Sequence, residues 1–237
     1  MLRDAGPTEG LDRQLAEVAP SLGLTLSDAD RARLLAYLEL IQRWTKVYNL
    51  TAVRNAEEMF THHLLDCLAV MRPLESGTAA QPTPLHVLDV GSGAGLPGVV
   101  LAILRPDWKV TCVDAVAKKT TFIRQVGTEL SLPNLQAVHG RVEAPATFGG
   151  QRFGLITSRA FASLADFTQL TRHLLTPGGV WAAMKAHLSD EERSGLRTDV
   201  CMFHVEQLRV PHLDAARCLV WLKPANNSSD PIVKPRQ

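Results

Sequence analysis

Cysteine, aromatic residues and long hydrophobic runs are all scarce in this chain of 237 residues. The four cysteines stand far apart in apolar surroundings and form no CxxC pair, so the sequence predicts buried thiols and neither a disulfide framework nor a metal site. The longest apolar stretches, such as Gly98–Leu104, are much shorter than the roughly 18 to 20 residues that cross a bilayer. Mixed charges at the start of the chain replace the apolar run of a secretion signal, and we therefore expect a cytoplasmic protein.

Neither sign of charge dominates, since the formal net charge is only +1. The charge is nevertheless uneven: residues 1–80 carry 8 basic and 11 acidic side chains, whereas residues 101–185 carry 10 basic and 5 acidic ones. This bias is compatible with a phosphate-rich ligand, although solvation of the surface explains it equally well. With 46% hydrophobic and 21% charged residues, the chain has the composition of a globular protein with a substantial core.

The N-terminal third is predicted to be helical. Ser27 and Asp30 form a capping box ahead of apolar residues at helical spacing, and Asn55 is placed to cap a second helix. Residues 76–84 are small, polar and proline-containing, as is typical of a linker. The sequence therefore predicts a helical extension over residues 1–80.

From Leu85 onward, short apolar strands alternate with helical segments, which indicates an α/β fold with a mostly parallel sheet and helices on both faces. The predicted strands are 85–90, 109–113, 135–139, 153–158, 179–184, 201–210 and 217–223, and the predicted helices are 96–104, 117–130, 163–175 and 189–198. A short connection between the last two strands predicts an antiparallel hairpin. We expect a Rossmann-like seven-stranded domain over 81–223 and a flexible tail over 224–237.

The most informative segment runs from Val87 to Gly98, where a strand ends in a glycine-rich turn and a helix begins. Glycines at such a turn let the backbone bend tightly and approach a ligand in the crevice beyond the carboxyl ends of the strands. The next strand ends in Asp114, 23 residues after Gly91, at the distance where an acid accepts hydrogen bonds from ribose hydroxyls. A ligand that contains a nucleoside is therefore predicted, with Gly91, Gly93 and Asp114 at its site.

Two classes of nucleoside ligand compete for this turn. The motif Gly93-x-Gly95-x-x-Gly98 matches the spacing of the dinucleotide fingerprint. That match is out of register, because the dinucleotide turn places its first glycine directly at the strand end, and counting from Gly91 the third position falls on Leu96. With Asp89 before the turn, the pattern D-x-G-x-G-x-G is that of S-adenosylmethionine sites, and Asp89 is therefore expected among the residues that contact this cofactor. The turn thus favours S-adenosylmethionine over a nicotinamide dinucleotide or a turn without ligand.

The residues after the fourth predicted strand constrain the acceptor of a methyl group. Methylation of an exocyclic amine calls for an Asn/Asp-Pro-Pro-aromatic turn, and the chain has Ser158-Arg159-Ala160-Phe161 instead. Methylation at carbon 5 of a pyrimidine needs a thiolate, and the cysteines are expected inside strands and helices. The N7 lone pair of a purine requires no base, so positioning by Arg159, the predicted catalytic residue, is sufficient. Arg159 is equally well placed to pair with an acid or with the carboxylate of the cofactor.

Further residues are expected at the same crevice. After the third predicted strand, Val142 offers an apolar edge to adenine and the backbone around Glu143 offers polar contacts. Lys118, Lys119 and Lys185 are predicted to face phosphates of the substrate, although each lysine alone is more often a solvated surface charge.

With these residues in view, residues 28–223 resemble the glucose-inhibited division protein B family, the guanine-N7 methyltransferases G of small-subunit ribosomal RNA. Five blocks in order carry the resemblance: Trp44-x-Lys46-x-Tyr48-Asn49-Leu50-Thr51, His63-x-Leu65-Asp66, Asp89 to Gly98, Arg141-Val142-Glu143 and Ser158-Arg159-Ala160-Phe161-Ala162. The resemblance implies transfer of a methyl group from S-adenosylmethionine to N7 of one guanine in 16S ribosomal RNA. It also implies cofactor contacts at Gly91, Leu96, Val142, Glu143 and Arg159.

The chain departs from the family pattern at Thr45, where Asn is usual, and at His62, where Arg is common. Asn49 is expected to contact the substrate by ordering a loop over the cleft, or else only to cap the turn between two helices. For His63 and Asp66, the alternative to a functional role is a packed pair on the second helix. Two other functions stay open, a nicotinamide-dependent oxidoreductase and a non-catalytic RNA-binding module, and a monomer is expected.

Overall fold

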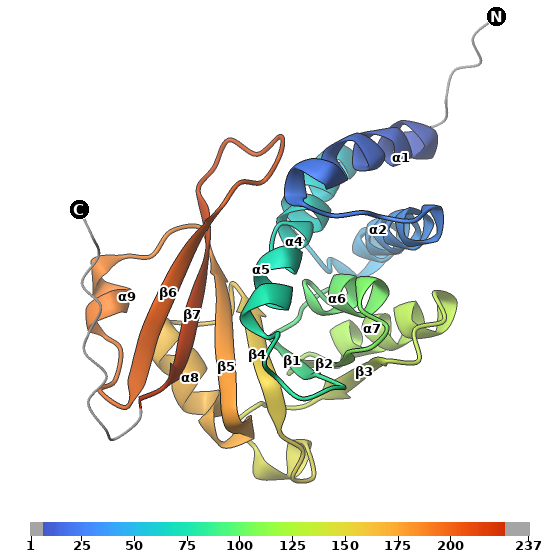
Figure 1. The fold of residues 1–237 in the computed structure, drawn as a ribbon. Helices are drawn as coiled ribbons and strands as arrows, with labels where there is room; N and C mark the ends of the chain where they lie inside the picture. The colour runs from blue at the N-terminus through green and yellow to red at the C-terminus, as the bar shows by residue number, and fades with distance from the viewer. Residues whose placement is uncertain (1–6, 226–237) are drawn as a thin grey trace, which may run out of the picture.

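The computed structural model describes residues 7–225, and Figure 1 shows a twisted sheet with helices against both faces. The seven strands lie in the order β3-β2-β1-β4-β5-β7-β6. Their bounds are β1 His86–Val90, β2 Lys109–Asp114, β3 Leu135–His139, β4 Phe153–Arg159, β5 Leu175–Lys185, β6 Val200–Leu208 and β7 Arg217–Pro224. Strands β1 to β5 are parallel, whereas β7 is antiparallel to both β5 and β6. The predicted fold class and the C-terminal hairpin are confirmed.

Helices precede the sheet and connect its strands. The N-terminal elements are α1 Pro7–Val18, η1 Ala19–Leu22, α2 Asp28–Tyr48, α3 Ala56–Met59, the π-helical segment η2 Phe60–Leu65, α4 Asp66–Leu68 and α5 Met71–Gly77. The helices that lie between strands along the chain are α6 Gly98–Leu104, α7 Ala117–Glu129, η3 Pro145–Thr147, α8 Leu164–Thr171, η4 Arg172–Leu174 and α9 Asp190–Ser194. Because strand order changes direction between β1 and β4, the carboxyl ends of these two strands flank the crevice that binds ligands in such sheets.

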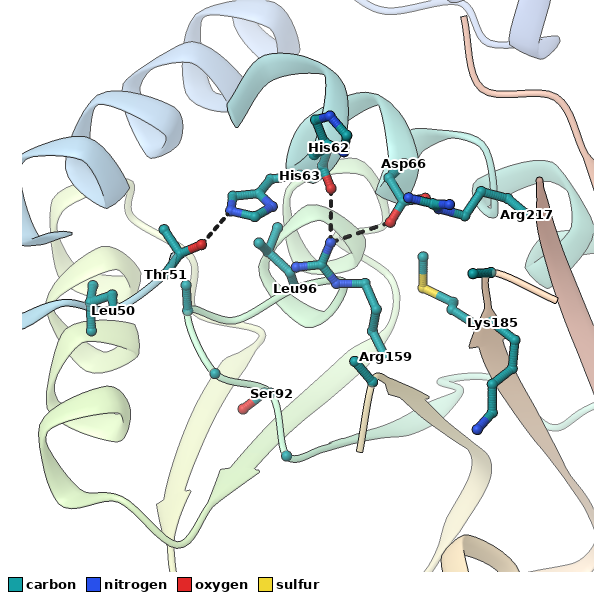
Figure 2. A pocket seen from close by; sticks show the side chains of 16 residues that line it. Leu50, Thr51, His62, His63, Asp66, Ser92, Leu96, Arg159, Lys185 and Arg217 are labelled. Carbon is teal, nitrogen blue, oxygen red and sulfur yellow. Dashed lines mark hydrogen bonds and ion pairs between the residues drawn. The ribbon is translucent and has the colours of Figure 1, made fainter. Parts of the chain in front are cut away.

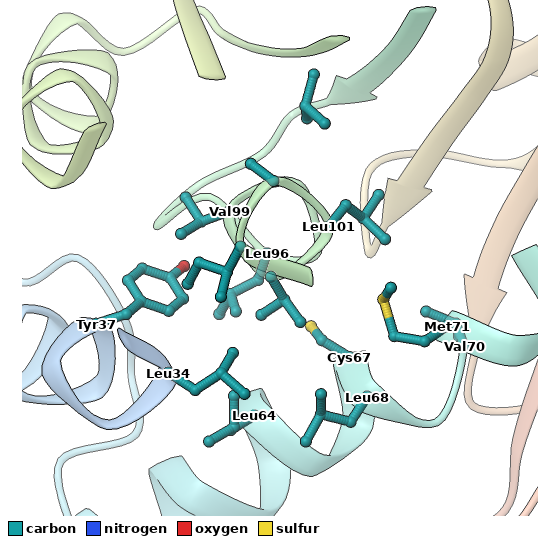
Figure 3. Close-up of a cluster of buried hydrophobic side chains, with 14 of the residues drawn as sticks. Leu34, Tyr37, Leu64, Cys67, Leu68, Val70, Met71, Leu96, Val99 and Leu101 are labelled. Atoms are coloured by element: carbon teal, nitrogen blue, oxygen red, sulfur yellow. The ribbon is translucent and has the colours of Figure 1, made fainter. Parts of the chain in front are cut away.

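Alternating side chains of the strands pack into two hydrophobic cores, one on each face of the sheet. Val87 of β1 belongs to the core that includes α2, α6 and α7, and the next residue, Leu88, belongs to the core that includes α8. Figure 3 shows Leu34 of α2 and Leu68 of α4 directed toward α6, the helix that carries Val99 and Leu101. The N-terminal helices thus bury their apolar faces against the sheet domain.

The longest N-terminal helix supports the glycine-rich turn directly. Its capping box is formed as predicted, with the Asp30 N–H donating to Oγ of Ser27 at 3.1 Å and the Ser27 N–H donating to Asp30 at 3.2 Å. Further along the helix, the buried Tyr37 hydroxyl donates to the carbonyl oxygen of Ala94 at 2.7 Å. This bond joins α2 to the turn, and it satisfies a phenol that has no access to water.

Several predicted boundaries are wrong. The helix predicted from Asn55 is divided into α3, the π-helical segment, α4 and α5, and α1 was not predicted because its short amphipathic pattern has no strong cap in the sequence. The predicted helix 163–175 ends early, since β5 begins at Leu175, and α9 covers only part of 189–198. The helix α5 also runs into the predicted linker, where Gly77 lies flat against the Trp221 ring of β7.

Three of the four cysteines are buried, as predicted, but Cys201 on the edge strand β6 is partly exposed. Of the predicted tail, Pro224 ends β7 and Ala225 donates from its N–H to the Asp199 carbonyl, while residues 226–237 lie outside the described residues. The division of the chain at residue 80 stays a prediction. No helix within residues 7–225 combines the length and apolar character that a membrane span requires.

Candidate functional site

The turn after β1 depends on backbone conformations that favour glycine. Gly91, Gly93 and Gly95 have φ angles of +63°, +59° and +91°. A Cβ atom on Gly91 would lie 2.5 Å from the Phe161 ring, whereas one on Gly93 would meet only the Gly91 carbonyl oxygen, at 4.0 Å. The space over Gly93 is therefore open, and the backbone there is accessible to a ligand.

Asp89 supports this turn from below. The carboxylate is fully buried, and its Oδ2 accepts a hydrogen bond of 2.9 Å from the N–H of Gly98 at the start of α6. Oδ1 has no partner among the described residues, and burial raises the pKa of Asp89 to about 7. The prediction that Asp89 contacts a cofactor directly is not supported, because the side chain has no exposed surface. It holds the backbone of the turn instead.

Asp114 at the end of β2 also braces the turn. Its Oδ2 accepts from the Gly93 N–H at 3.0 Å and its Oδ1 from the Val116 N–H at 2.8 Å, while Nζ of Lys119 lies 3.6 Å from Oδ2. Each carboxylate oxygen has a second lone pair, so hydrogen bonds to ribose hydroxyls stay possible. The carboxylate is thereby fixed in place before any ligand arrives.

Two hollows open at the carboxyl ends of the parallel strands, and Gly91 and Ala160 line both. The first, which we call the charged cavity, has a volume of about 360 Å³ and is lined by Leu50, Thr51, His62, His63, Asp66, Gly91, Ser92, Gly93, Ala94, Leu96, Arg159, Ala160, Met184, Lys185, Ala186 and Arg217. The second, the outer hollow, has a volume of about 470 Å³ and is lined by Val90, Gly91, Val113, Asp114, Ala115, Lys119, Gly140, Arg141, Val142, Glu143, Ala160, Phe161 and Leu170. Ala160 has a φ of +53°, a strained conformation for a residue with a Cβ, at the junction of the two.

Arg159 crosses the charged cavity toward the N-terminal helices (Figure 2). Its Nη1 donates to the His62 carbonyl oxygen at 3.0 Å and to Oδ2 of Asp66 at 3.2 Å. The side-chain hydrogen bonds of Arg159 within residues 7–225 are thus both donated by Nη1, which leaves the edge formed by Nε and Nη2 available to a ligand. Oδ1 of Asp66 accepts a further bond of 3.0 Å from Nε of Arg217.

His63 lies on the same wall of the charged cavity. Its Nε2 is hydrogen-bonded to Oγ1 of Thr51 at 2.8 Å, and its Nδ1 has no partner among the described residues. Burial, and next the positive charge of Arg159, lower the pKa of His63 to about 4. The ring is therefore neutral at physiological pH. His63 and Asp66, for which a packed pair on one helix is the alternative to a functional role, are each hydrogen-bonded to a residue of another element.

The structure brings most of the predicted site residues together. Gly91, Gly93, Leu96, Arg159 and Lys185 line the charged cavity. Asp114, Lys119, Val142 and Glu143 line the outer hollow.

Three of the predicted substrate contacts are placed differently from the expectation. Lys185 lines the charged cavity, but its Nζ donates to Glu192 at 2.6 Å and to the Ala162 carbonyl at 2.9 Å, and Figure 2 shows it directed away from Arg159. Lys118 is exposed on α7 and lines neither hollow. Asn49 ends α2 with a φ of +51° and accepts a hydrogen bond from Arg54, which is the capping alternative. Its neighbours Leu50 and Thr51 line the cavity in its place.

Two residues of the site were missed as functional residues. Arg217 begins β7 and stands 151 positions from the Asp66 that it contacts, so no local pattern links them. Asp66 belongs to one of the five family blocks, but its partners come from β4 and β7. An acid on the apolar face of a predicted helix was the available signal, because a buried carboxylate needs a partner.

The sheet order, the glycine turn and the two hollows at the carboxyl ends of β1 and β4 define a class I S-adenosylmethionine-dependent methyltransferase fold. Solved structures agree on the fold. TrmN from Thermus thermophilus aligns with a TM-score of 0.52 at 14% identity, over 93% of this chain and 79% of that one. The E81Q mutant of MtNAS in complex with S-adenosylmethionine aligns with a TM-score of 0.54 at 14% identity, over 94% and 80% of the two chains.

Sequence comparison defines the family. The model of the GidB family, described as rRNA small subunit methyltransferase G, matches residues 30–220. Ribosomal RNA small subunit methyltransferase G of Leptothrix cholodnii is 57% identical over 211 residues, covering 89% of this chain and 94% of that protein. That of Methylibium petroleiphilum is 52% identical over 214 residues, covering 90% and 95%. The chain belongs to the GidB family and is a methyltransferase, which sets aside the oxidoreductase and the non-catalytic module.

Proposed function

We propose that this chain transfers the methyl group of S-adenosylmethionine to N7 of one guanine in 16S ribosomal RNA, either free or within the small subunit. The observation that carries the proposal is the guanidinium of Arg159 in the charged cavity, where its side-chain hydrogen bonds within residues 7–225 use Nη1 and leave the Nε–Nη2 edge without a protein partner. The names of the relatives support a small-subunit RNA as the substrate. S-adenosylmethionine, when bound, would supply a sulfonium methyl group whose carbon a lone pair of the acceptor can attack, with S-adenosylhomocysteine as the leaving group.

The residues of the outer hollow fit the nucleoside part of this methyl donor. Val142 is almost fully buried and offers an apolar edge, while Asp114 presents a carboxylate already fixed by two backbone N–H groups. The open space over Gly93 and the junction at Gly91 allow one ligand to extend from the outer hollow into the charged cavity. We propose Gly91, Gly93, Leu96, Asp114, Val142, Glu143 and Arg159 as the residues that hold it.

The charged cavity fits an acceptor that loses no proton when it attacks. A neutral His63 is a weak base, and Asp66 is already bonded to two guanidinium groups. No cysteine lines either hollow within residues 7–225, and β4 is followed by Ala160 instead of the turn that amine methylation requires. A purine N7 needs only to be positioned, and the free edge of Arg159 matches the O6 side of guanine or the carboxylate of the methyl donor.

The experiment incubates the purified protein with labelled S-adenosylmethionine and small subunits, or their RNA, from cells that lack the modification. We expect one labelled guanine, at which mild reduction followed by aniline cleaves the chain, as is characteristic of N7-methylguanine. Label on another base would exclude N7 transfer. Arg159→Ala should reduce methylation about 100-fold or more while the protein stays folded. Arg197→Ala is the matched control, since that exposed arginine pairs with Asp199 and lines neither hollow.

We also propose that the enzyme acts as a monomer in the cytoplasm, where ribosomal RNA is made. Among residues 7–225, the exposed large hydrophobic side chains are Val47 and Tyr48 at the end of α2, Val116 before α7 and Phe203 on β6, so at most two of them are neighbours in one element. Light scattering of the purified enzyme at micromolar concentration tests the oligomeric state, and a mass of twice the chain would contradict the proposal.

A further inference from the structure

The N-terminal helices meet the charged cavity at an irregular turn. In a regular α-helix the N–H of Asp66 would donate to the carbonyl of His62, four residues earlier. In the π-helical segment Phe60–Leu65 this N–H donates instead to the carbonyls of Thr61 and His63. The His62 carbonyl accepts a hydrogen bond from Arg159 at the end of β4. Such π-helical turns are rare and occur frequently at functional sites.

The same turn also places the buried Asp66 carboxylate within hydrogen-bond distance of the Arg159 guanidinium. Asp66 is 4% exposed and divides its two oxygens between Arg159 and Arg217. Charged partners stabilise the ionised form of a carboxyl group buried to this degree, and hydrogen bonds between charged groups are shorter and stronger than those between neutral ones. Both bonds span a long stretch of sequence, 93 residues to Arg159 and 151 residues to Arg217.

These contacts fix the direction in which Arg159 points. Two acceptors from the N-terminal helices, the His62 carbonyl and the Asp66 carboxylate, both hold Nη1 (Figure 2). Because the guanidinium is planar and rigid, fixing one of its nitrogens restricts the plane and turns the opposite Nε–Nη2 edge to the ligand. A long arginine side chain without these acceptors samples many rotamers.

We infer that Asp66 is a positioning residue for methyl transfer: through its bond to Nη1 it orients Arg159 toward the methyl donor or the guanine. The inference rests on the proposed function and assigns a role in the site to the N-terminal helices. Arg217 satisfies the other oxygen of Asp66 and is expected to contribute mainly to the burial of the carboxylate.

The test compares Asp66→Asn, Arg159→Lys and the double variant. The control is Glu75→Gln, because Glu75 on α5 also bridges two arginines, Arg72 and Arg105, but lies away from the two hollows. Thermal melts establish that each variant is folded. Calorimetry with S-adenosylhomocysteine then measures the affinity without any turnover, and steady-state assays on small subunits give kcat and KM for both substrates.

We expect Asp66→Asn to lower kcat/KM on the order of 10-fold to 100-fold, as for a misplaced catalytic group. Asp66→Asn and Arg159→Lys should change the same parameter, which is either the affinity for S-adenosylhomocysteine or kcat. In the Arg159→Lys background the effect of Asp66→Asn should shrink to less than about 2-fold, whereas in an Arg217→Lys background it should persist. Glu75→Gln should leave all of these parameters unchanged.

The inference is overturned if the effects of Asp66→Asn and Arg159→Lys are additive, or if the effect disappears in the Arg217→Lys background instead. A loss of activity that only matches the unfolded fraction in the melts also overturns it. If Asp66→Asn does not fold, Asp66→Glu replaces it, since the longer acid keeps the charge and shifts the guanidinium. Mapping the labelled base separates this outcome from failure of the proposed function: label away from a guanine N7 refutes that function, while the coupling can still be measured by calorimetry.

Discussion

The two sides of the site are built by different means. On one side, the turn after β1 consists of consecutive residues, and its shape comes from positive φ angles at Gly91, Gly93 and Gly95. On the other side, the charged cavity wall joins Asp66, Arg159 and Arg217 from three distant parts of the chain. The turn is specified by local backbone conformation, whereas the wall exists only after the N-terminal helices have packed on the sheet. Substitutions on the two sides should therefore differ in their effects on stability and on ligand binding.

The largest effect is expected at the turn. Gly91→Val places a branched side chain against the Phe161 ring at a φ of +63°, and should lower the free energy of unfolding by about 2 to 5 kcal/mol and abolish binding of S-adenosylhomocysteine. Urea unfolding and calorimetry measure the two effects. Gly178→Ala is the control, because its φ of +76° is equally positive but its Cβ meets nothing within 4 Å. Equal losses in the two variants would show that φ, and not the contact with Phe161, limits the turn.

The second effect concerns the acid under the turn. The pKa of Asp89 is raised to about 7 in the folded state from 3.8, so the folded protein binds more protons between these values. Asp89 therefore contributes stability at low pH that is lost as the pH rises through about 7. Asp89→Asn keeps an acceptor for Gly98 and should remove this dependence, which is on the order of 2 to 4 kcal/mol between pH 4 and 8. Parallel stability curves of the two proteins would contradict the buried position of the carboxylate.

The charged cavity should respond to pH in the opposite direction. The pKa of His63 is lowered to about 4 from 6.5, so the unfolded chain binds more protons between these values, and the stability that His63 contributes above pH 6.5 is lost as the pH falls through 4. His63→Gln keeps a partner for Thr51. It should reduce the loss in the free energy of unfolding at acidic pH by on the order of 1 to 3 kcal/mol. Denaturant titrations at pH 5 and 7 make the comparison. His204→Gln on the exposed part of β6 should leave the decrease in stability at acidic pH unchanged.

The smallest effects are expected from substitutions of single exposed lysines. Lys118→Ala should weaken RNA binding about 2-fold and lower the slope of log K against log salt by about 1, because this exposed side chain is predicted to contact one phosphate. Lys109→Ala at the opposite end of β2 is the control. Filter binding at several salt concentrations measures both. Identical slopes in wild type and Lys118→Ala would remove Lys118 from the predicted substrate contacts.

Much of the sheet was predictable because its signals are local. Alternating short apolar strands and helices indicated the parallel sheet, and the spacing from Gly91 to Asp114 located the first two strand ends. The predictions that were wrong depend on distant contacts. Asp89 was expected at the ligand because its position in the motif says nothing about the Gly98 N–H above it. The helix from Asn55 was expected to be continuous, since no sequence signal marks the π-helical turn whose His62 carbonyl meets Arg159.

The amino-acid sequence by itself determined the fold class and the glycine turn, because periodicity and positive φ angles are properties of neighbouring residues. Tertiary structure alone decided which charges meet in the cavity and which edge of Arg159 is free for a ligand. The physical reason is that a buried ion pair is specified by the two surfaces that enclose it, and here one surface is the N-terminal helices and the other is the end of the sheet.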